Sequence, residues 1–204
     1  MGKGSKGART KQLILEKAFV LFSNGAYNNV SLRKIEEVTG LSRGALLFHF
    51  PAKEQMFSSV VDKYVLQNLS ASRNVDDKEK ITLKKFINSY TRQLSDLKKE
   101  LFELGITNMS FALVNLNLQA FHFYPNFADK AKAWNKTETM IWHAVISNAA
   151  ESGEINKNNN VTILASMFKN LFHGTGYEGI NTTNDIDINL LEQEYLLLYN
   201  SLLR

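Results

Sequence analysis

Apolar residues recur every three or four positions along most of this chain, which is the spacing of helices with one buried face. The first such stripe runs from Ile14 to Phe22 and follows Thr10, which we expect to cap the helix. Only two prolines occur, at positions 51 and 125, so long helices can run almost uninterrupted. The pattern predicts an all-α fold.

Residues 31–50 predict two short helices joined by a tight turn. The hydroxyl of Ser31 can accept hydrogen bonds from the free amides that open the first helix. Gly40 can adopt the left-handed conformation in which such a helix ends, and Ser42 can cap the second helix, from position 43 to about 49. Two short helices around a Gly-containing turn are typical of a helix-turn-helix, whose second helix enters the DNA major groove.

The charge of the chain is concentrated at this end. Residues 1–53 carry nine Lys or Arg against three Glu, whereas residues 54–204 carry fifteen against seventeen acidic residues. Binding to phosphates requires a positive surface of this kind. Residues 1–9 are rich in Gly and Lys, and we expect them to be either a mobile arm that lies along DNA or an unstructured tail.

Residues 10–57 resemble the DNA-binding domain of the TetR family of bacterial transcriptional regulators. The matching segments are ILEKAFVLF, VSLRKI after Tyr27, GLSRGA and HFPAKEQMF, which follow one another in the family's order. The resemblance implies a three-helix helix-turn-helix domain over residues 1–51. It also implies a helical-bundle regulatory and dimerisation domain over residues 52–204.

Three positions depart from the family's pattern. Glu36 stands where a small residue is usual, so its carboxylate must reach solvent or a partner. The glycine before the loop aromatic lies one residue early, at Gly25. Leu47 replaces an aromatic residue, often tyrosine, whose hydroxyl could donate to phosphate. Contacts to the DNA backbone should therefore depend more on His49 and Lys53.

The expected DNA interface combines phosphate-binding and base-reading groups. Lys34 and the amides at the two helix starts are expected to hold phosphates, and the resemblance adds His49 and Lys53. Arg43 can form two hydrogen bonds to guanine, and a neighbouring apolar side chain can contact a thymine methyl group. The residues expected nearest the bases are Arg33, Arg43, Ala45 and Phe48. The full expected interface is Ser31, Arg33, Lys34, Ser42, Arg43, Gly44, Ala45, Phe48, His49 and Lys53.

Further helices are expected after Pro51, which disfavours helix at the residue before it. The first should run from Lys53 to about Ser70, and in the resembling family this helix connects the two domains. A polar run over residues 72–80 follows it. The remaining helices are expected over residues 81–97, 104–124, 126–151, 161–173 and 188–203.

Residues 104–128 contain no Asp, Glu, Lys or Arg, yet they are too polar for a membrane span. On a helix, four polar side chains between Asn108 and His122 share one line beside an apolar stripe. That arrangement suits a ligand cavity with apolar walls, but the amides can equally bond to neighbouring helices or to buried water. The candidate ligand-binding residues are Asn108, Asn115, Gln119, His122, Trp142 and His143.

The last helix carries more large apolar residues than one side of a monomer can bury. Burial against a second subunit would keep this surface from water, so we expect a homodimer. In the resembling family the last two helices form a four-helix dimer interface. We assign that role to residues 161–175 and 188–203.

Other kinds of site are weakly indicated. Residues 174–179 read G-x-G-x-x-G, but a dinucleotide loop needs a preceding strand, so we interpret this segment as a helix end and a loop. The spacing of His122, His143 and His173 fits no compact metal site, so we expect no metal and no cofactor. No nucleophile elbow, P-loop or paired-carboxylate pattern occurs, so we do not expect an enzyme.

The chain contains no cysteine and no signal-peptide pattern, which fits a cytoplasmic protein with no membrane span. We expect a homodimeric, ligand-responsive transcriptional repressor that binds a palindromic double-stranded DNA operator and is released by a small-molecule effector. The alternative is a helical small-molecule-binding or adaptor protein that does not bind DNA specifically. The uneven charge argues against that alternative.

Overall fold

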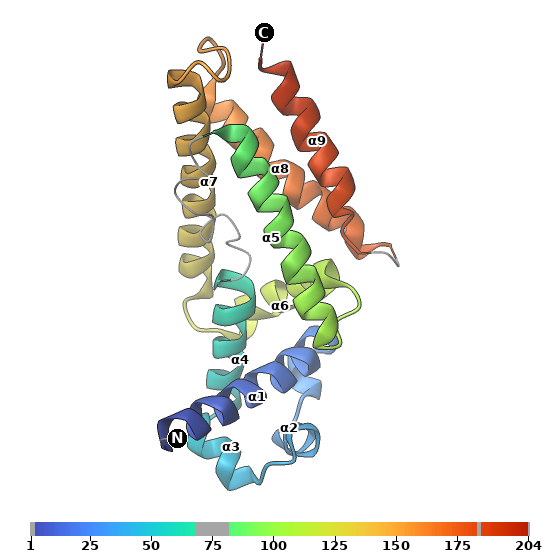
Figure 1. The fold of residues 1–204 in the computed structure, drawn as a ribbon. Helices are drawn as coiled ribbons and strands as arrows, with labels where there is room; N and C mark the ends of the chain where they lie inside the picture. The colour runs from blue at the N-terminus through green and yellow to red at the C-terminus, as the bar shows by residue number, and fades with distance from the viewer. Residues whose placement is uncertain (1–2, 68–81, 183–184, 204) are drawn as a thin grey trace. The chain divides into compact units, whose positions relative to one another are not determined.

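Helices make up the regular structure of this chain, as the sequence predicted. The computed structural model describes residues 3–67, 82–182 and 185–203, and those ranges contain no strand (Figure 1). Two short turns, η1 (Tyr27–Asn29) and the π-helical η2 (Asp62–Gln67), follow α1 and α4. The helices are α1 (Lys3–Asn24), α2 (Leu32–Thr39), α3 (Arg43–His49), α4 (Lys53–Val61), α5 (Leu83–Glu103), α6 (Met109–Phe123), α7 (Phe127–Glu151), α8 (Val161–Ile180) and α9 (Ile188–Ser201).

The chain divides into two compact units. The first unit contains α4 and most of α6 in addition to α1, α2 and α3, while the expected division after residue 51 stays a prediction. The reason is packing, because α1 lies against α4, and Phe123 of α6 stacks on Tyr27 with 4.2 Å between ring centroids. The first unit comprises Met1–Leu69, Glu103–Ile106 and Phe111–Ala128, and the second comprises Ser70–Phe102, Thr107–Ser110 and Asp129–Arg204.

Aromatic side chains from α1 and α4 form the core of the first unit. Phe19 and Phe22 of α1 are fully buried, and so is Phe57 of α4. The ring of Phe57 stands edge-on to Phe22 and to Tyr27, with 5.1 Å between centroids in each pair. Such edge-to-face pairs stabilise a core beyond the area that they bury. They fix the scaffold on which α2 rests, because α2 packs against α1.

The N-terminal segment is helical from Lys3, so two expectations for it were wrong. Thr10 is not an N-cap, because it lies inside α1, where its Oγ1 donates to the carbonyl of Lys6 at 3.0 Å. The expected arm over residues 1–9 is also part of α1 from position 3 onward. Lys, Ala and Arg favour helix, and here they outweigh the glycines at positions 4 and 7.

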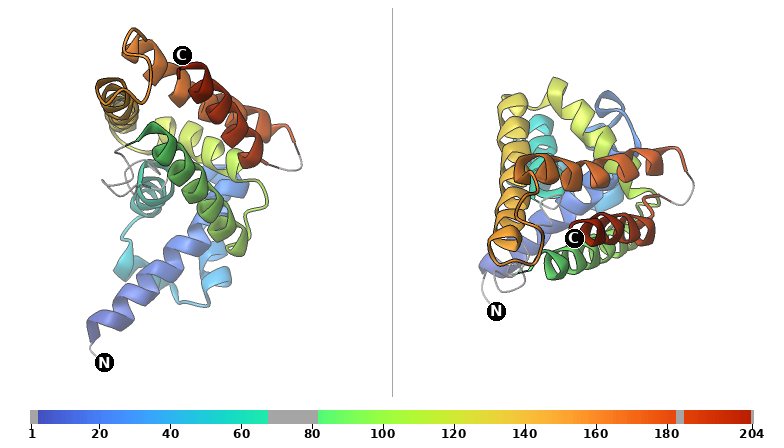
Figure 2. Two further views of the ribbon diagram at one scale, coloured as in Figure 1. Left: turned by 45° about the horizontal axis from the view of Figure 1, so that its top comes forward. Right: turned by 90° about the horizontal axis from the view of Figure 1, so that it is seen from above.

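Trp142 of α7 lies at the centre of the core of the second unit. Its side chain is fully buried, and its ring centroid lies 4.9 Å from Phe86 of α5, 5.3 Å from Phe168 of α8 and 5.4 Å from Tyr195 of α9. A single indole thus joins four helices. In the same unit, α8 and α9 pack against each other (Figure 2).

The glycine-rich segment after His173 is helical, so its interpretation as a helix end and a loop was wrong. Helix α8 continues to Ile180 and contains Gly174, Gly176 and Gly179. Gly179 permits a close backbone approach, since a Cβ there would lie 2.6 Å from the nitrogen of Ile186. The chain therefore passes directly over the last turn of α8 before α9 begins.

Other helix ends differ from the expectation or cannot be compared with it. The helix expected from position 104 begins at Met109, after Gly105 adopts a φ of 99°. The helix that starts at Lys53 is regular to Val61 and π-helical to Gln67. Its expected end near position 70, the polar run 72–80 and the expected helix start at 81 lie outside the described residues. Within the part of the chain that is described, no helix is long and apolar enough to cross a lipid bilayer.

Candidate nucleic-acid interface

Helices α2 and α3 form a helix-turn-helix with the caps that the sequence predicted. Ser31 Oγ accepts from the backbone N–H of Lys34 at 3.2 Å, and Ser42 Oγ accepts from that of Ala45 at 3.3 Å. Gly40 ends α2 with a φ of 68°, the left-handed conformation that favours glycine. Local side-chain chemistry therefore determines where both helices begin and where the first one ends.

Each of the two helices buries one apolar residue completely, and both turn their Lys and Arg residues outward. Ile35 and Leu46 are fully buried against the rest of the unit. Lys34 and Arg43 are exposed, as are Gly44 and the two capping serines, while Ala45 is half-buried. Phe48 is 83% exposed, which is unusual for a phenylalanine. The outer surface of α3 thus presents a cation and an aromatic ring, the two side-chain types expected to read bases.

Arg33 is held by a weak interaction on the protein surface. Its Nε lies 3.1 Å from Oε1 of Glu37, one turn later in α2, and both side chains are mostly exposed. Exposed ion pairs at this spacing contribute only about 0.3–0.5 kcal/mol. Arg33 can therefore exchange Glu37 for a phosphate or a base at little cost.

Lys53 is bound to the protein's own backbone, in contrast to the phosphate contact expected from the resemblance. Its Nζ donates to the carbonyls of Tyr27 and Val30, each at 3.1 Å, and lies 3.9 Å from the centroid of the Tyr27 ring. Partial burial lowers the pKa of Lys53, while the neighbouring Glu54 charge acts in the opposite direction. These two bonds fix the loop before α2 to the first turn of α4.

Two other residues of the interface have neighbours that the sequence did not indicate. His49 is half-buried, its ring stands edge-on to Phe48 with 5.2 Å between centroids, and it lines a groove of about 500 Å³ with Lys11 and Tyr124. The carboxylate of Glu36 does not reach solvent fully, because its Oε1 is buried and has no hydrogen-bond partner among the described residues. A small residue at that position would avoid this burial.

The polar line of α6 binds the end of α1, which is the second of the two readings that the sequence left open. Asn115 Nδ2 donates to the carbonyl of Ser23 at 2.8 Å. Gln119 Nε2 donates to the carbonyl of Gly25 at 3.2 Å, and its Oε1 accepts from the backbone N–H of Tyr27. The two amides thereby satisfy carbonyls that the last turn of a helix leaves without partners.

The other candidate ligand-binding residues lie in different surroundings. In the second unit, Asn108 Nδ2 donates to the carbonyls of Gly179 and Thr182, at 2.8 and 3.1 Å. His122 and His143 are exposed, while Trp142 lies inside the ring cluster of the core. Periodicity alone did not distinguish a side chain that binds a ligand from one that caps a helix.

Sequence reasoning missed a buried carboxylate beside that ring cluster. Glu138 of α7 is 3% exposed and lies one helical turn before Trp142. Burial raises the pKa of the Tyr90 and Tyr195 hydroxyls, and the charge of Glu138 raises it further. The i, i+4 spacing of Glu138 and Trp142 could have indicated a shared face. Elsewhere in the described ranges, no three His, Asp or Glu side chains converge as metal ligands.

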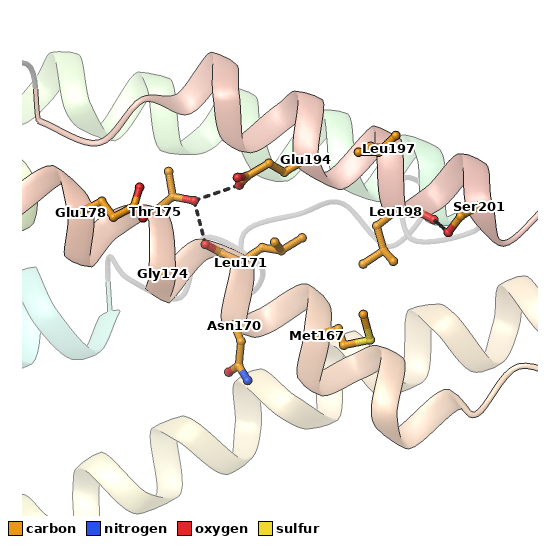
Figure 3. A pocket seen from close by; sticks show the side chains of 10 residues that line it. All are labelled: Met167, Asn170, Leu171, Gly174, Thr175, Glu178, Glu194, Leu197, Leu198 and Ser201. Atoms are coloured by element: carbon orange, nitrogen blue, oxygen red, sulfur yellow. Dashed lines mark hydrogen bonds between the residues drawn. The ribbon is translucent and has the colours of Figure 1, made fainter.

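A groove of about 690 Å³ lies between α8 and α9 (Figure 3). One end is polar, because Thr175 Oγ1 donates to Glu194 Oε2 at 3.1 Å and Glu178 lies nearby. The other end is lined by Met167, Leu171, Leu197 and Leu198. Leu197 is 74% exposed and Met167 45% exposed, so this helix pair presents an apolar surface to solvent.

Comparison with known proteins finds relatives of the part of the chain that contains the helix-turn-helix. The sequence model of the bacterial regulatory proteins of the tetR family matches residues 14–60. The HTH-type transcriptional repressor AcnR of Corynebacterium efficiens is 43% identical over 54 residues, which cover 26% of this chain and 29% of that repressor. The match thus spans less than a third of the relative's length.

Two solved structures share the fold over nearly the whole chain. A TetR-family transcriptional regulator from Cytophaga hutchinsonii is 20% identical, with a TM-score of 0.71 over 97% of this chain and 96% of that one. A transcriptional regulator from Saccharomonospora viridis in complex with choline is 16% identical, with a TM-score of 0.65 over 95% of this chain and 96% of that one. At these identities the likeness establishes the fold alone.

Proposed function

Because this chain belongs to the TetR family of bacterial regulatory proteins, we propose that it regulates transcription by binding a palindromic DNA operator as a homodimer. The observation that carries the proposal is the outer surface of the helix-turn-helix. There Arg43 and Phe48 are exposed on α3, while Lys34 is exposed at the start of α2. Arg43 and Phe48 would read bases in the major groove, and Lys34 would hold phosphate.

The proposed dimer forms through α8 and α9, where exposed apolar side chains border the groove. Met167 is 45% exposed and Leu197 74% exposed in the single chain. A two-fold axis between two such surfaces would bury them and would present two α3 helices to one face of DNA. Half-sites would then lie about one helical turn, roughly 34–36 Å, apart.

The regulator is proposed to be a cytoplasmic repressor that a small molecule releases from its operator. AcnR is named a repressor, and the structure from Saccharomonospora viridis is described as a complex with choline. A ligand that prefers a dimer with the wrong spacing of the α3 helices would lower operator affinity by its difference in affinity for the two states.

Selection of binding sites from random DNA tests the proposal, and it should enrich a palindrome. Arg43→Ala should relax specificity at one position of each half-site, by about 1–3 kcal/mol. Lys132→Ala, at an exposed position of α7, is the matched control and should leave binding unchanged. If no sequence is enriched at low salt, the chain is not a sequence-specific regulator.

A further inference from the structure

The groove of about 500 Å³ at the end of α3 lies within the first unit. Its lining residues come from α1, from the end of α3, from α4 and from the corner after α6. Tyr124 holds that corner in place, because its hydroxyl donates to both carboxylate oxygens of Asp62, at 2.7 and 2.8 Å. One wall of the groove is therefore fixed by the protein itself.

Side chains that can donate hydrogen bonds are concentrated in this groove. Lys11 of α1 lines it together with Gln55, Ser58 and Ser59 of α4. No hydrogen bond or ion pair joins these four side chains to the residues that the structure describes, and the ammonium of Lys11 lies 5.5 Å from the ring centroid of Phe50. An ammonium offers three donors, a carboxamide two and a hydroxyl one. The groove therefore suits a ligand that is rich in acceptors.

The charges around the groove include more than one cation. His49, at the end of α3, lines it beside Lys11 and can carry a positive charge. Among the described lining residues, Glu54 is the one carboxylate, and the neighbouring charge of Lys53 interacts favourably with it. An anion in the groove is thus attracted by Lys11 and repelled by Glu54, so both charges can be tested.

We propose that this groove binds the phosphate group of an organic phosphate, with Lys11 supplying charge and Gln55, Ser58 and Ser59 supplying hydrogen bonds. A phosphate has enough oxygen atoms to accept from several donors, and hydrogen bonds to a charged acceptor are the stronger ones. Pro125 and the ring of Phe50 border room for the organic part.

Two sources share this chemistry, a free small molecule and the DNA backbone. The ring of His49 stands edge-on to the exposed ring of Phe48, with 5.2 Å between centroids, so the groove begins beside the surface that is proposed to read bases. A backbone phosphate next to the half-site would reach it from there. The DNA source rests on the proposed function, whereas binding of a free organic phosphate does not.

Phenyl phosphate, compared with phenol, tests the site in the full-length protein. Isothermal titration calorimetry at low ionic strength should show one phenyl phosphate bound per chain and no binding of phenol. Lys11→Gln should weaken phenyl phosphate binding about fivefold, the effect of one unit charge a few ångströms away in water. Glu54→Gln should strengthen it, because a like charge is removed. Equal affinities of the wild type and Lys11→Gln would overturn the site.

Lys17→Gln is the matched control, since Lys17 is an exposed lysine of the same helix and does not line the groove. It should leave phenyl phosphate affinity unchanged. An equal loss in Lys11→Gln and Lys17→Gln would mean that only the overall charge of α1 matters, which would also overturn the site.

Binding to a non-specific DNA duplex distinguishes the two sources. If the backbone occupies the groove, Lys11→Gln should reduce the slope of log affinity against log salt concentration by about one, and Lys17→Gln should not. A changed slope without phenyl phosphate binding assigns the site to DNA, and the reverse result assigns it to a free organic phosphate. Neither effect would overturn the proposal. If operator selection fails while phenyl phosphate binds, the site stands and the proposed function falls.

Discussion

The backbone N–H of Tyr27 donates to Gln119 Oε1, 92 residues further along the chain. The side-chain amide of Gln119 also donates from Nε2 to the carbonyl of Gly25 at 3.2 Å. One side chain of α6 therefore binds both sides of the turn after α1. Stacking of Tyr27 on Phe123, one turn later in α6, places an aromatic contact beside this pair. Contacts from α6 therefore hold in place the turn that leads from α1 into the helix-turn-helix.

Replacement of Gln119 by Ala should destabilise the first unit by about 1–3 kcal/mol, because a part-buried N–H and a part-buried carbonyl lose their partner. Chemical denaturation followed by circular dichroism measures the change. His122→Ala, at an exposed position one turn on, should stay within about 0.5 kcal/mol of the wild type. Similar losses in both variants would show that the Gln119 hydrogen bonds do not matter.

The salt dependence of operator binding should separate Lys53 from Lys34. Lys34→Ala should reduce the slope of log affinity against log salt concentration by about one, because a phosphate contact is lost. Lys53→Ala should leave the slope unchanged and lower the melting temperature, because its Nζ holds the carbonyls of Tyr27 and Val30. A slope reduced equally by both substitutions would restore the phosphate role of Lys53.

The two glycines of α8 at positions 174 and 179 should respond to alanine in opposite directions. Gly179→Ala should destabilise the second unit by about 1–3 kcal/mol, because its Cβ would lie 2.6 Å from a backbone nitrogen. Gly174→Ala adds a methyl group in open space and should stabilise the helix by up to about 1 kcal/mol. Urea unfolding measures both, and a stabilising Gly179→Ala would mean that the chain over α8 can move away.

A charge in the groove between α8 and α9 should dissociate the proposed dimer. Leu197→Glu places a carboxylate at an apolar position that is 74% exposed in the single chain, and sedimentation velocity should then show monomers. Leu118→Glu makes the same change at a 60% exposed position of α6 and should leave the dimer intact. Dimers in both variants would assign the interface to another surface.

Local chemistry explains which parts of this molecule could be predicted from its sequence. Ser31, Gly40 and Ser42 act on residues at most four positions away, so their roles as caps and as a helix end followed from spacing. The hydrogen bonds of Asn115 and Gln119 join segments more than 90 residues apart, and no periodicity shows whether an amide faces a ligand or a carbonyl. A phosphate contact of Lys53 was expected from the resemblance. The resemblance did not indicate its hydrogen bond to the carbonyl of Tyr27, 26 residues earlier in the chain.

The glycines of α8 were expected to form a loop, and that expectation from local sequence was wrong. Three glycines within six positions favour a loop, yet packing against the segment before α9 keeps this stretch helical. Glu138 shows a third case, because a charged residue on a predicted helix is normally solvated. Its burial depends on four helices that meet around Trp142.

The serine caps of α2 and α3 also determine the electrostatic field that these helices offer to DNA. Neither helix has an acidic residue in its first turn, and serine caps the amides without adding a charge. The macrodipole of each helix, equivalent to about half a positive charge at its start, is therefore left unneutralised. Aspartate would cap both helices equally well but would cancel that field. Serine at these two positions thus favours folding and DNA binding together, whereas aspartate would preserve the fold and oppose contact with phosphate.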